Sequence, residues 1–127
     1  MKSIEMNAMS IPAIGFGTWP LKGSQCANMV EAAIAAGFQH IDTAQMYGNE
    51  AQVGEAIRQS GVARKDIYVV TKVDPGNAGA NRFRSSVERS IGDLGGPVDL
   101  LLIHWPPPDE EVDATVDRLV EAHAAGL

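Results

Sequence analysis

The stretch HIDTAQMYGNE, residues 40–50, places an acid and a phenol around the end of a short apolar segment. Residues 38–42, FQHID, predict a short strand that ends at Asp42, and Tyr47 follows in a predicted loop. Each residue has an ordinary explanation, because Asp42 could cap a turn and Tyr47 could pack within the loop. Their meaning therefore depends on the residues that follow the other predicted strands.

Similar segments recur along the chain. Short apolar runs predict four strands, and the amphipathic stretches between them predict four helices. We expect Asn49 and Asn81 to cap the second and third helices. Residues 3–12 predict a hairpin around Asn7-Ala8, although Asn-Ala is a poor turn dipeptide. The predicted strands are residues 13–19, 38–42, 67–72 and 98–104, and the predicted helices are residues 25–37, 50–61, 82–95 and 113–127.

This strand–helix order, repeated with short connections, indicates an α/β fold with parallel strands. Two architectures have this order: an open doubly wound sheet and part of a (β/α)8 TIM barrel. A dinucleotide-binding open sheet would carry G-x-G-x-x-G after its first strand, whereas residues 15–20 read GFGTWP and lack the third glycine. The missing glycine argues against the open sheet.

Composition narrows the classes of function. The chain has 127 residues, of which 45% are hydrophobic and 20% charged, which is typical of one globular domain. A net charge of −6 argues against nucleic acid and acidic membranes as partners. The one cysteine allows no intrachain disulfide, and no Cys/His spacing predicts a metal site. We expect no signal peptide, no membrane helix and a cytoplasmic location.

Polar side chains stand at the carboxyl ends of three predicted strands. Asp42, Lys72 and His104 end the second, third and fourth strands, and Tyr47 lies in the loop after Asp42. Taken singly, Asp42 could equally well cap a turn, and the other three are more ordinary as a solvated strand end, a core or rim histidine and a packing residue. In a barrel, however, all four would meet at the rim where active sites are built. Their coincidence favours a functional site.

These four side chains suit one kind of chemistry. A phenol with a pKa near 10 is a poor proton donor at neutral pH, and a neighbouring ammonium group would lower that pKa. A carboxylate would hold the ammonium group in place, and a histidine could orient a carbonyl oxygen. The set fits proton donation to a carbonyl during hydride transfer, and the hydride requires a nicotinamide cofactor.

The sequence resembles the N-terminal half of an aldo-keto reductase, in particular bacterial 2,5-diketo-gluconate reductases and related aldehyde reductases. The resemblance rests on four segments in the family's order and extends from about residue 11 to residue 127. The DTA and YGNE parts of the second segment are its most specific features. The four segments are IPAIGFGTW (11–19), GFQHIDTAQMYGNEAQVGEAI (37–57), VVTK (69–72) and DLLLIHWP (99–106).

The resemblance implies a catalytic tetrad and the surrounding site. Tyr47 would be the general acid, Lys72 would lower its pKa, Asp42 would pair with Lys72, and His104 would orient the substrate carbonyl. The resemblance also implies NADPH as the cofactor and a small-molecule carbonyl substrate. Implied cofactor-binding residues are Thr18, Asp42 and Lys72, and implied substrate-binding residues are Trp19, Tyr47, His104 and Trp105.

A complete barrel has eight strands and typically about 250 residues. We therefore expect residues 1–127 to form the N-terminal half of one barrel domain, which would pair with a C-terminal half or with a self-association partner. The expected activity of the full barrel is NADPH-dependent carbonyl reduction, and we expect the isolated chain to be inactive. The alternatives are a non-catalytic cofactor-binding or regulatory subunit and a structural half-barrel.

Overall fold

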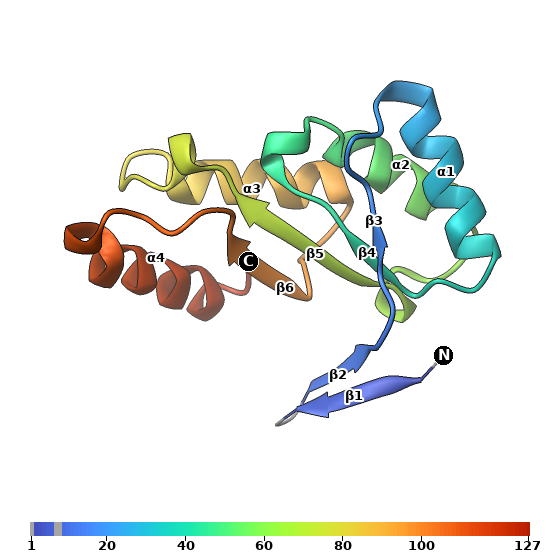
Figure 1. Ribbon diagram of the computed structural model, residues 1–127, viewed down its shortest axis with the longest axis horizontal. Coiled ribbons are helices and arrows are strands. Elements are labelled where there is room, and N and C mark those ends of the chain that lie inside the picture. Colours follow the sequence, from blue (N-terminus) through green and yellow to red (C-terminus); the bar gives the residue numbers. More distant parts are fainter. Residues whose placement is uncertain (1, 7–8) are drawn as a thin grey trace.

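Among residues 2–6 and 9–127, which the computed structural model describes, four parallel strands form a curved sheet and four α-helices pack around it (Figure 1). The strands follow one another in the order β3-β4-β5-β6, so each pairs with its neighbour in the sequence. This arrangement confirms the predicted repeat of parallel βα units. The strands are β3 (Phe16–Gly17), β4 (His40–Asp42), β5 (Tyr68–Val73) and β6 (Leu100–Ile103), and the helices are α1 (Gly23–Ala35), α2 (Glu50–Gln59), α3 (Phe83–Leu94) and α4 (Val112–Ala124).

A separate antiparallel hairpin precedes the sheet. It consists of β1 (Ser3–Met6) and β2 (Met9–Pro12), in a register that pairs Ser3 with Pro12. The hairpin lies apart from the parallel strands, beyond the start of β3 (Figure 1). The predicted hairpin is confirmed, whereas its predicted turn at Asn7-Ala8 lies outside the described residues.

The parallel strands are staggered along one another. Asp42 pairs with both Gly17 and Val70, and Lys72, two positions further along β5, pairs with Leu102. A stagger of this kind accompanies the curling of a sheet toward a barrel. It also places the polar ends of β4, β5 and β6 along one edge.

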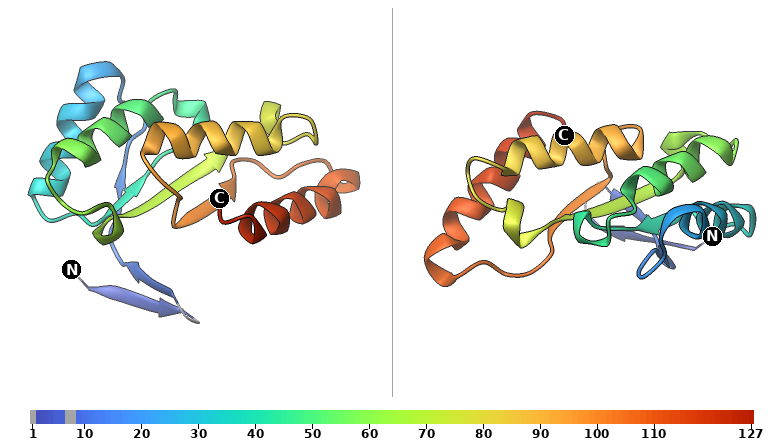
Figure 2. Two further views of the ribbon diagram at one scale, coloured as in Figure 1. Left: turned by 180° about the vertical axis from the view of Figure 1, so that it is seen from behind. Right: turned by 90° about the horizontal axis from the view of Figure 1, so that it is seen from above.

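Helices α1, α2 and α3 lie side by side on one face of the sheet, and α4 lies beside β6 (Figures 1 and 2). Alternation along the strands directs Ile41 and Val69 toward α1 and α2, and Val73 toward α3 and α4. Burial of each large aliphatic side chain contributes about 1.5–3 kcal/mol. The main core consists of Cys26, Val30, Ile34, Ile41, Val53, Ala56, Ile57, Ile67, Val69 and Leu94, and a second core consists of Val73, Phe83, Val87 and Ala122.

The other face of the sheet carries the predicted site residues. Asp42 and Lys72 point to this face, because Ile41 and Val73 beside them point to the helices. Leu102, on the same face of β6, is 38% exposed. No helix among the described residues covers this face (Figure 2).

Helices α2 and α3 approach each other closely at Gly54. A Cβ atom built on Gly54 would lie 1.9 Å from the carbonyl oxygen of Asp93 and 3.0 Å from Cα of Leu94. Real Cβ atoms do not approach backbone atoms to 1.9 Å, so only glycine fits this crossing.

Two predicted helix caps are wrong. Asn49 occupies the N-cap position of α2, but its side chain makes no capping hydrogen bond and turns toward other loops. Helix α3 begins at Phe83 with Arg82 as its N-cap, and Asn81 lies in the preceding turn. The carbonyl of Gly79 accepts from the amides of Arg82 and Phe83, at 3.1 and 3.0 Å. The preceding turn therefore provides the hydrogen-bond acceptor that a capping side chain would have provided at the start of α3.

Candidate active site

The structure brings together the four side chains predicted at the strand ends. Asp42 ends β4, Lys72 lies near the end of β5, and His104 follows β6 directly. Tyr47 ends a short 3-10 turn, η1 (Gln45–Tyr47), in the loop after β4. The Tyr47 ring lies 5.3 Å from the ammonium nitrogen of Lys72 and 5.5 Å, between centroids, from the ring of His104.

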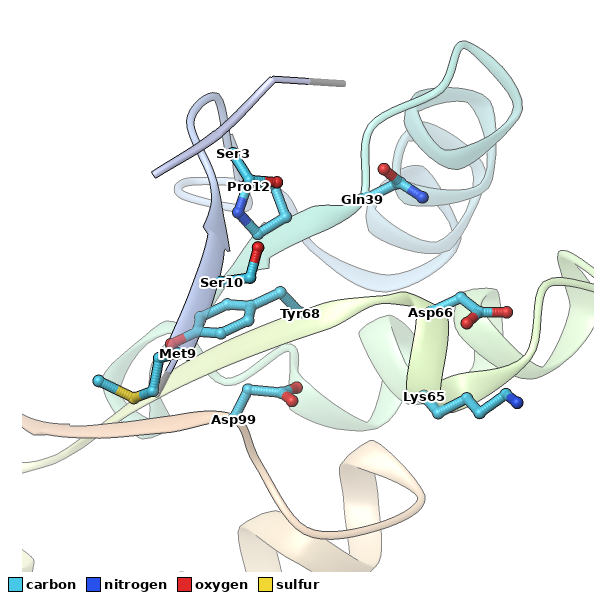
Figure 3. Close-up of a pocket in the computed structure, with 9 residues that line it drawn as sticks. All are labelled: Ser3, Met9, Ser10, Pro12, Gln39, Lys65, Asp66, Tyr68 and Asp99. Carbon is cyan, nitrogen blue, oxygen red and sulfur yellow. The ribbon is translucent and has the colours of Figure 1, made fainter. Parts of the chain in front are cut away.

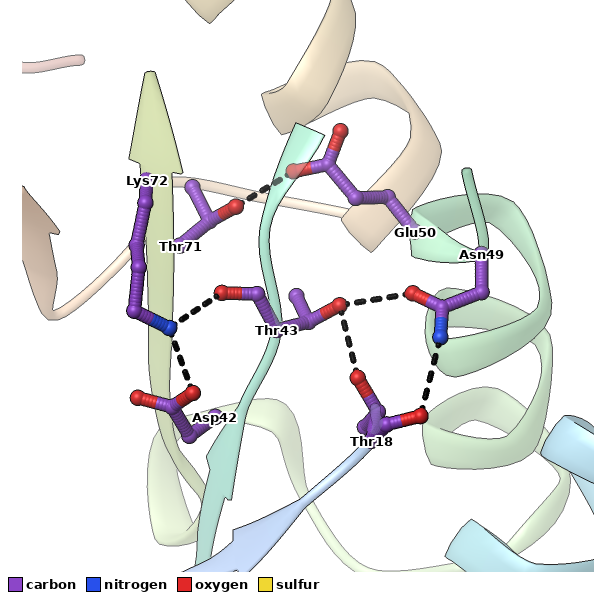
Figure 4. Close-up of polar contacts among 7 residues, drawn as sticks. All are labelled: Thr18, Asp42, Thr43, Asn49, Glu50, Thr71 and Lys72. Carbon is purple, nitrogen blue, oxygen red and sulfur yellow. Dashed lines mark hydrogen bonds and ion pairs between the residues drawn. The ribbon is translucent and has the colours of Figure 1, made fainter. Parts of the chain in front are cut away.

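Lys72 and Asp42 form an ion pair at the base of the site (Figure 4). The ammonium group donates to Asp42 Oδ1 at 2.5 Å and to the carbonyl oxygen of Thr43 at 2.9 Å. Charge-assisted hydrogen bonds of this kind are strong and directional. They hold a positive charge beside the Tyr47 ring, and they leave the second carboxylate oxygen of Asp42 without a hydrogen bond from the described residues.

A row of rings forms the mouth of the site. Trp19 lies 5.4 Å from Tyr47, His104 meets Tyr47 edge-on, and Trp105 stacks on His104 at 5.6 Å, all between centroids. With Met46 they line a cavity of about 240 Å³. Trp19 and Trp105 are 63% and 59% exposed, so large apolar surfaces face the open side of this cavity. Such exposed apolar surface is typical of a binding site.

His104 presents one ring nitrogen to the cavity. Its Nδ1 is buried and has no hydrogen-bond partner within residues 2–6 and 9–127. Nε2 is consequently the nitrogen that can meet a molecule in the cavity, where the His104 ring lies between Tyr47 and Trp105.

Thr18 lies behind the cavity instead of lining it. Its side chain is fully buried, and its hydroxyl donates to Thr43 Oγ1 at 3.0 Å. Thr43 Oγ1 in turn donates to Asn49 Oδ1 at 2.8 Å (Figure 4). In this conformation the Thr18 side chain offers no surface to a ligand.

The sequence interpretation missed two residues that flank Tyr47. The Gln45 amide nitrogen donates to Ser86 and Ser90 of α3, and its oxygen accepts from the Asp74 amide at 2.9 Å and from Asn77 at 3.0 Å. Asn49, which was expected to cap α2, is fully buried among the loops. The sequence marks both only as amide side chains close to Tyr47, which does not predict their distant partners.

Glu50, the first residue of α2, is a buried acid on the helix side of β5 (Figure 4). Its carboxylate accepts from Thr71 at 2.5 Å and from Ser90 at 3.0 Å. Burial raises the pKa of the Glu50 carboxyl, and the two hydroxyl hydrogen bonds partly oppose that rise. Glu50 faces away from the ring-lined cavity and belongs to the packing of α2 against α3.

A larger hollow, of about 390 Å³, lies at the opposite end of the strands (Figure 3). It is lined by the hairpin and by the start of β5, where burial, with a smaller effect from Asp99, raises the pKa of Tyr68. His40, at the start of β4, packs edge-on against Tyr68 and contacts the carbonyl of Pro12. Active sites of βα barrels form at the carboxyl ends of the strands, so we assign the candidate site to the smaller cavity.

Two further features are absent from the described part of the chain. It contains no cluster of three or more His, Cys, Asp or Glu side chains that could hold a metal ion. None of its helices has both the length and the apolar character needed to cross a bilayer.

Comparison with known sequences identifies relatives over almost the whole chain. The sequence model of the aldo/keto reductase family matches residues 13–127. Methylglyoxal reductase DkgB of Escherichia coli O157:H7 is 43% identical over 122 residues, which cover 94% of this chain and 46% of that protein. The 9,11-endoperoxide prostaglandin H2 reductase of Trypanosoma cruzi is 44% identical over 119 residues, which cover 91% of this chain and 42% of that protein. The chain thus spans about half the length of the curated relatives it matches.

Solved structures give the same result. An aldo/keto reductase from Brucella melitensis superposes with a TM-score of 0.92 at 36% identity, covering 98% of this chain and 50% of that one. MGS-M4, an aldo-keto reductase from a Medee basin deep-sea metagenome library, superposes with a TM-score of 0.89 at 36% identity, covering 94% of this chain and 44% of that one. These likenesses confirm the predicted fold class: the four βα units correspond to about half of a (β/α)8 barrel.

Proposed function

Because the chain belongs to the aldo/keto reductase family, we propose that, as part of a complete barrel, it reduces aldehyde or ketone carbonyls to alcohols with NADPH. The observation that carries this proposal is the convergence of Asp42, Lys72, Tyr47 and His104 at one rim of the sheet. No metal is needed for the chemistry proposed below.

Tyr47 is the proposed general acid. Its hydroxyl donates a proton to the carbonyl oxygen as that oxygen gains negative charge. The Lys72 ammonium, 5.3 Å from the centre of the Tyr47 ring, stabilises the phenolate that remains after the transfer. Asp42 keeps the ammonium group in this position through its 2.5 Å hydrogen bond.

His104 is the proposed orienting residue. With Nδ1 buried, Nε2 is left to donate a hydrogen bond to the carbonyl oxygen. The His104 ring meets the Tyr47 ring at 84°, so both can reach one oxygen atom from different directions. Two donors on one oxygen fix the plane of the carbonyl group and polarise it.

The residues present fit a nicotinamide cofactor in part. Asp42 has a carboxylate oxygen free to accept a hydrogen bond from a ribose hydroxyl, and Lys72 supplies positive charge beside it. When bound, the nicotinamide supplies the hydride that protein side chains cannot supply. Thr18, also predicted to bind the cofactor, has its side chain buried behind the rim, so we propose that it acts indirectly.

The substrate is proposed to be a small carbonyl compound. The cavity of about 240 Å³ is lined by Trp19, Met46, Tyr47, His104 and Trp105, which leaves room for a compact molecule with an apolar or planar flank. Relatives bear names such as methylglyoxal reductase and morphine 6-dehydrogenase, so the names alone span small and large substrates.

The inner face of the sheet needs a cover for this site to work. Within the described residues, β3 pairs only with β4 and β6 only with β5, and Leu102 of β6 is exposed on this face. We propose that residues 1–127 act as the N-terminal half of one barrel, closed by a C-terminal half or by a self-association partner. Closure would also exclude water from the reacting carbonyl.

The test compares two tyrosine variants of the native protein, whose intact mass is measured first. NADPH oxidation is followed with methylglyoxal as the carbonyl substrate. Tyr47→Phe should lower kcat by about 10²–10⁴-fold with little change in the Kd of NADPH, because the phenol proton is needed only in the chemical step. Tyr68→Phe is the matched control, because Tyr68 lies at the opposite end of the strands and is expected to retain activity. Equal turnover in Tyr47→Phe and the wild type would contradict the assignment of the acid.

A further inference from the structure

Asn49 makes three hydrogen bonds that are unusual for its position. At the start of a helix, an asparagine ordinarily turns back to accept from the first helical amides. The Asn49 carboxamide instead turns inward, and it is fully buried. Its oxygen accepts from Thr43 Oγ1 at 2.8 Å, and its nitrogen donates to the carbonyl oxygen of Thr18 at 3.2 Å (Figure 4). The same nitrogen donates to the carbonyl oxygen of Leu21 at 3.0 Å.

These bonds join the two loops that carry rings of the cavity. Thr18 and Leu21 bracket the segment that contains Trp19, and the amide of Leu21 also donates to the Thr18 carbonyl at 2.8 Å. Asn49 follows the turn that ends at Tyr47. The carboxamide therefore spans the gap between the Trp19 loop and the Tyr47 loop, on the side away from the cavity where their rings meet at 5.4 Å.

The same side chain reaches the ion pair through one residue. The Thr43 hydroxyl donates a hydrogen bond to Asn49, and the Thr43 carbonyl oxygen accepts one from the Lys72 ammonium at 2.9 Å. The hydroxyl and carbonyl of Thr43 belong to one residue, so a shift of Thr43 moves the second acceptor of Lys72. The hydroxyl of Thr18 also binds Thr43, so the three buried side chains form a continuous chain of hydrogen bonds behind the rim.

We propose that Asn49 is a positioning residue for the reduction, which rests on the function proposed above. Its carboxamide ties the Trp19 loop to the Tyr47 loop and keeps the Thr43 carbonyl on Lys72. Only an amide satisfies all three partners, since the site requires two N–H donors and one acceptor in a buried space. An aspartate of the same shape would face two carbonyl oxygens with no hydrogen to donate, and unpaired buried groups are costly.

The test is Asn49→Asp in the native protein, with Asn28→Asp as the matched control on the exposed surface of α1. At a temperature where every variant is folded, Asn49→Asp should lower kcat for NADPH-dependent methylglyoxal reduction by about 10²-fold, because misplacement by about 1 Å has that effect on reacting groups. The Kd of NADPH should change much less than kcat. Asn28→Asp should match the wild type in both.

A second pair of variants separates the hydrogen bond from the shape of the side chain. Thr43→Val keeps the shape of the side chain and removes the hydroxyl that binds Asn49, whereas Thr43→Ser keeps the hydroxyl. We expect Thr43→Val to lower kcat in the same sense as Asn49→Asp, and Thr43→Ser to retain most of the turnover. Equal losses in both Thr43 variants would mean that packing, and not the hydrogen bond, is responsible.

Hydrogen exchange gives a readout that does not depend on turnover. Asn49→Asp should speed amide exchange in residues 16–22, which carry the Thr18 and Leu21 carbonyls, while Asn28→Asp should not. Unchanged exchange there, or unchanged kcat in Asn49→Asp, would overturn the proposal. An inactive wild-type protein would refute the proposed function, and the tether between the loops would then stand or fall on the exchange result alone.

Discussion

The crossing of α2 and α3 gives the sharpest test of the packing. Gly54→Ala adds one methyl group where the new Cβ would meet the Asp93 carbonyl oxygen at 1.9 Å and its carbon at 2.9 Å. The obstacle is backbone, so no side chain can rotate out of the way. Since ordinary contact begins near 3.4 Å, the two helices would have to separate locally by roughly 1.5 Å.

The expected cost follows from two opposing effects. Alanine in a helix interior is favoured over glycine by about 1 kcal/mol. Overpacking of a well-packed interior costs typically about 1–3 kcal/mol and occasionally more, and a clash with backbone belongs at the upper end. We therefore expect a net loss of about 2 kcal/mol in the free energy of unfolding of Gly54→Ala.

Gly92→Ala is the matched control, because Gly92 lies in α3 and a Cβ there would meet nothing within 4 Å. This variant should gain up to about 1 kcal/mol from helix propensity alone. Urea unfolding followed by far-UV circular dichroism measures both changes. A Gly54→Ala protein with the midpoint of the wild type, or one shifted in the same direction as Gly92→Ala, would refute the close crossing of the two helices.

Three other perturbations have defined outcomes. Lys72→Met should lower kcat by about 10²-fold or more, because it removes the charge that stabilises the Tyr47 phenolate, and Lys65→Met at the opposite end of β5 should not; NADPH oxidation by the two variants decides. Burial raises the pKa of Glu50. The contribution of this carboxyl to the free energy of unfolding is therefore fully present below the unfolded-state pKa of about 4.3, and it is lost as the pH rises through the folded pKa. Glu50→Gln lacks this pH-dependent loss, so its urea midpoint should gain on that of the wild type as the pH rises above about 4.3, and a constant difference would contradict the buried acid. Arg64→Lys should destabilise the protein by about 1–2 kcal/mol in thermal unfolding, because the guanidinium group joins the Ile67 and Pro97 carbonyls with Asp99 and an ammonium group cannot span them; an unchanged Tm would count against that bridge.

The arrangement of strands and helices was largely predictable from the sequence. Its signals are local: the apolar segment that contains Val69 and Val70, for example, is β-branched and short, and the stripe that includes Val53 and Ile57 repeats at helical spacing. The ends of the strands then fixed which edge Asp42, Lys72 and His104 would share. Parallel topology brings such residues together without any knowledge of the side-chain contacts.

The network behind the rim was not predictable in the same way. The sequence around Gln45 and Asn49 is that of a loop residue and a helix cap, and it does not indicate their hydrogen-bond partners. Asn49 binds Leu21, which lies 28 residues away along the chain, and Gln45 binds Ser90, which lies 45 residues away. Local rules favoured a cap at Asn49, whereas burial required that the Thr18 and Leu21 carbonyls be satisfied.

The two exposed indole rings allow ligand binding at the cavity mouth to be followed by tryptophan fluorescence. The chain has two tryptophans, and both stand beside the rings of Tyr47 and His104 at the rim. Neither buried core contains a tryptophan, so tryptophan emission carries little information about them. A compound that enters between the indoles should change their emission even when no reaction follows. Fluorescence titration can therefore screen carbonyl compounds for binding before any turnover assay identifies a substrate.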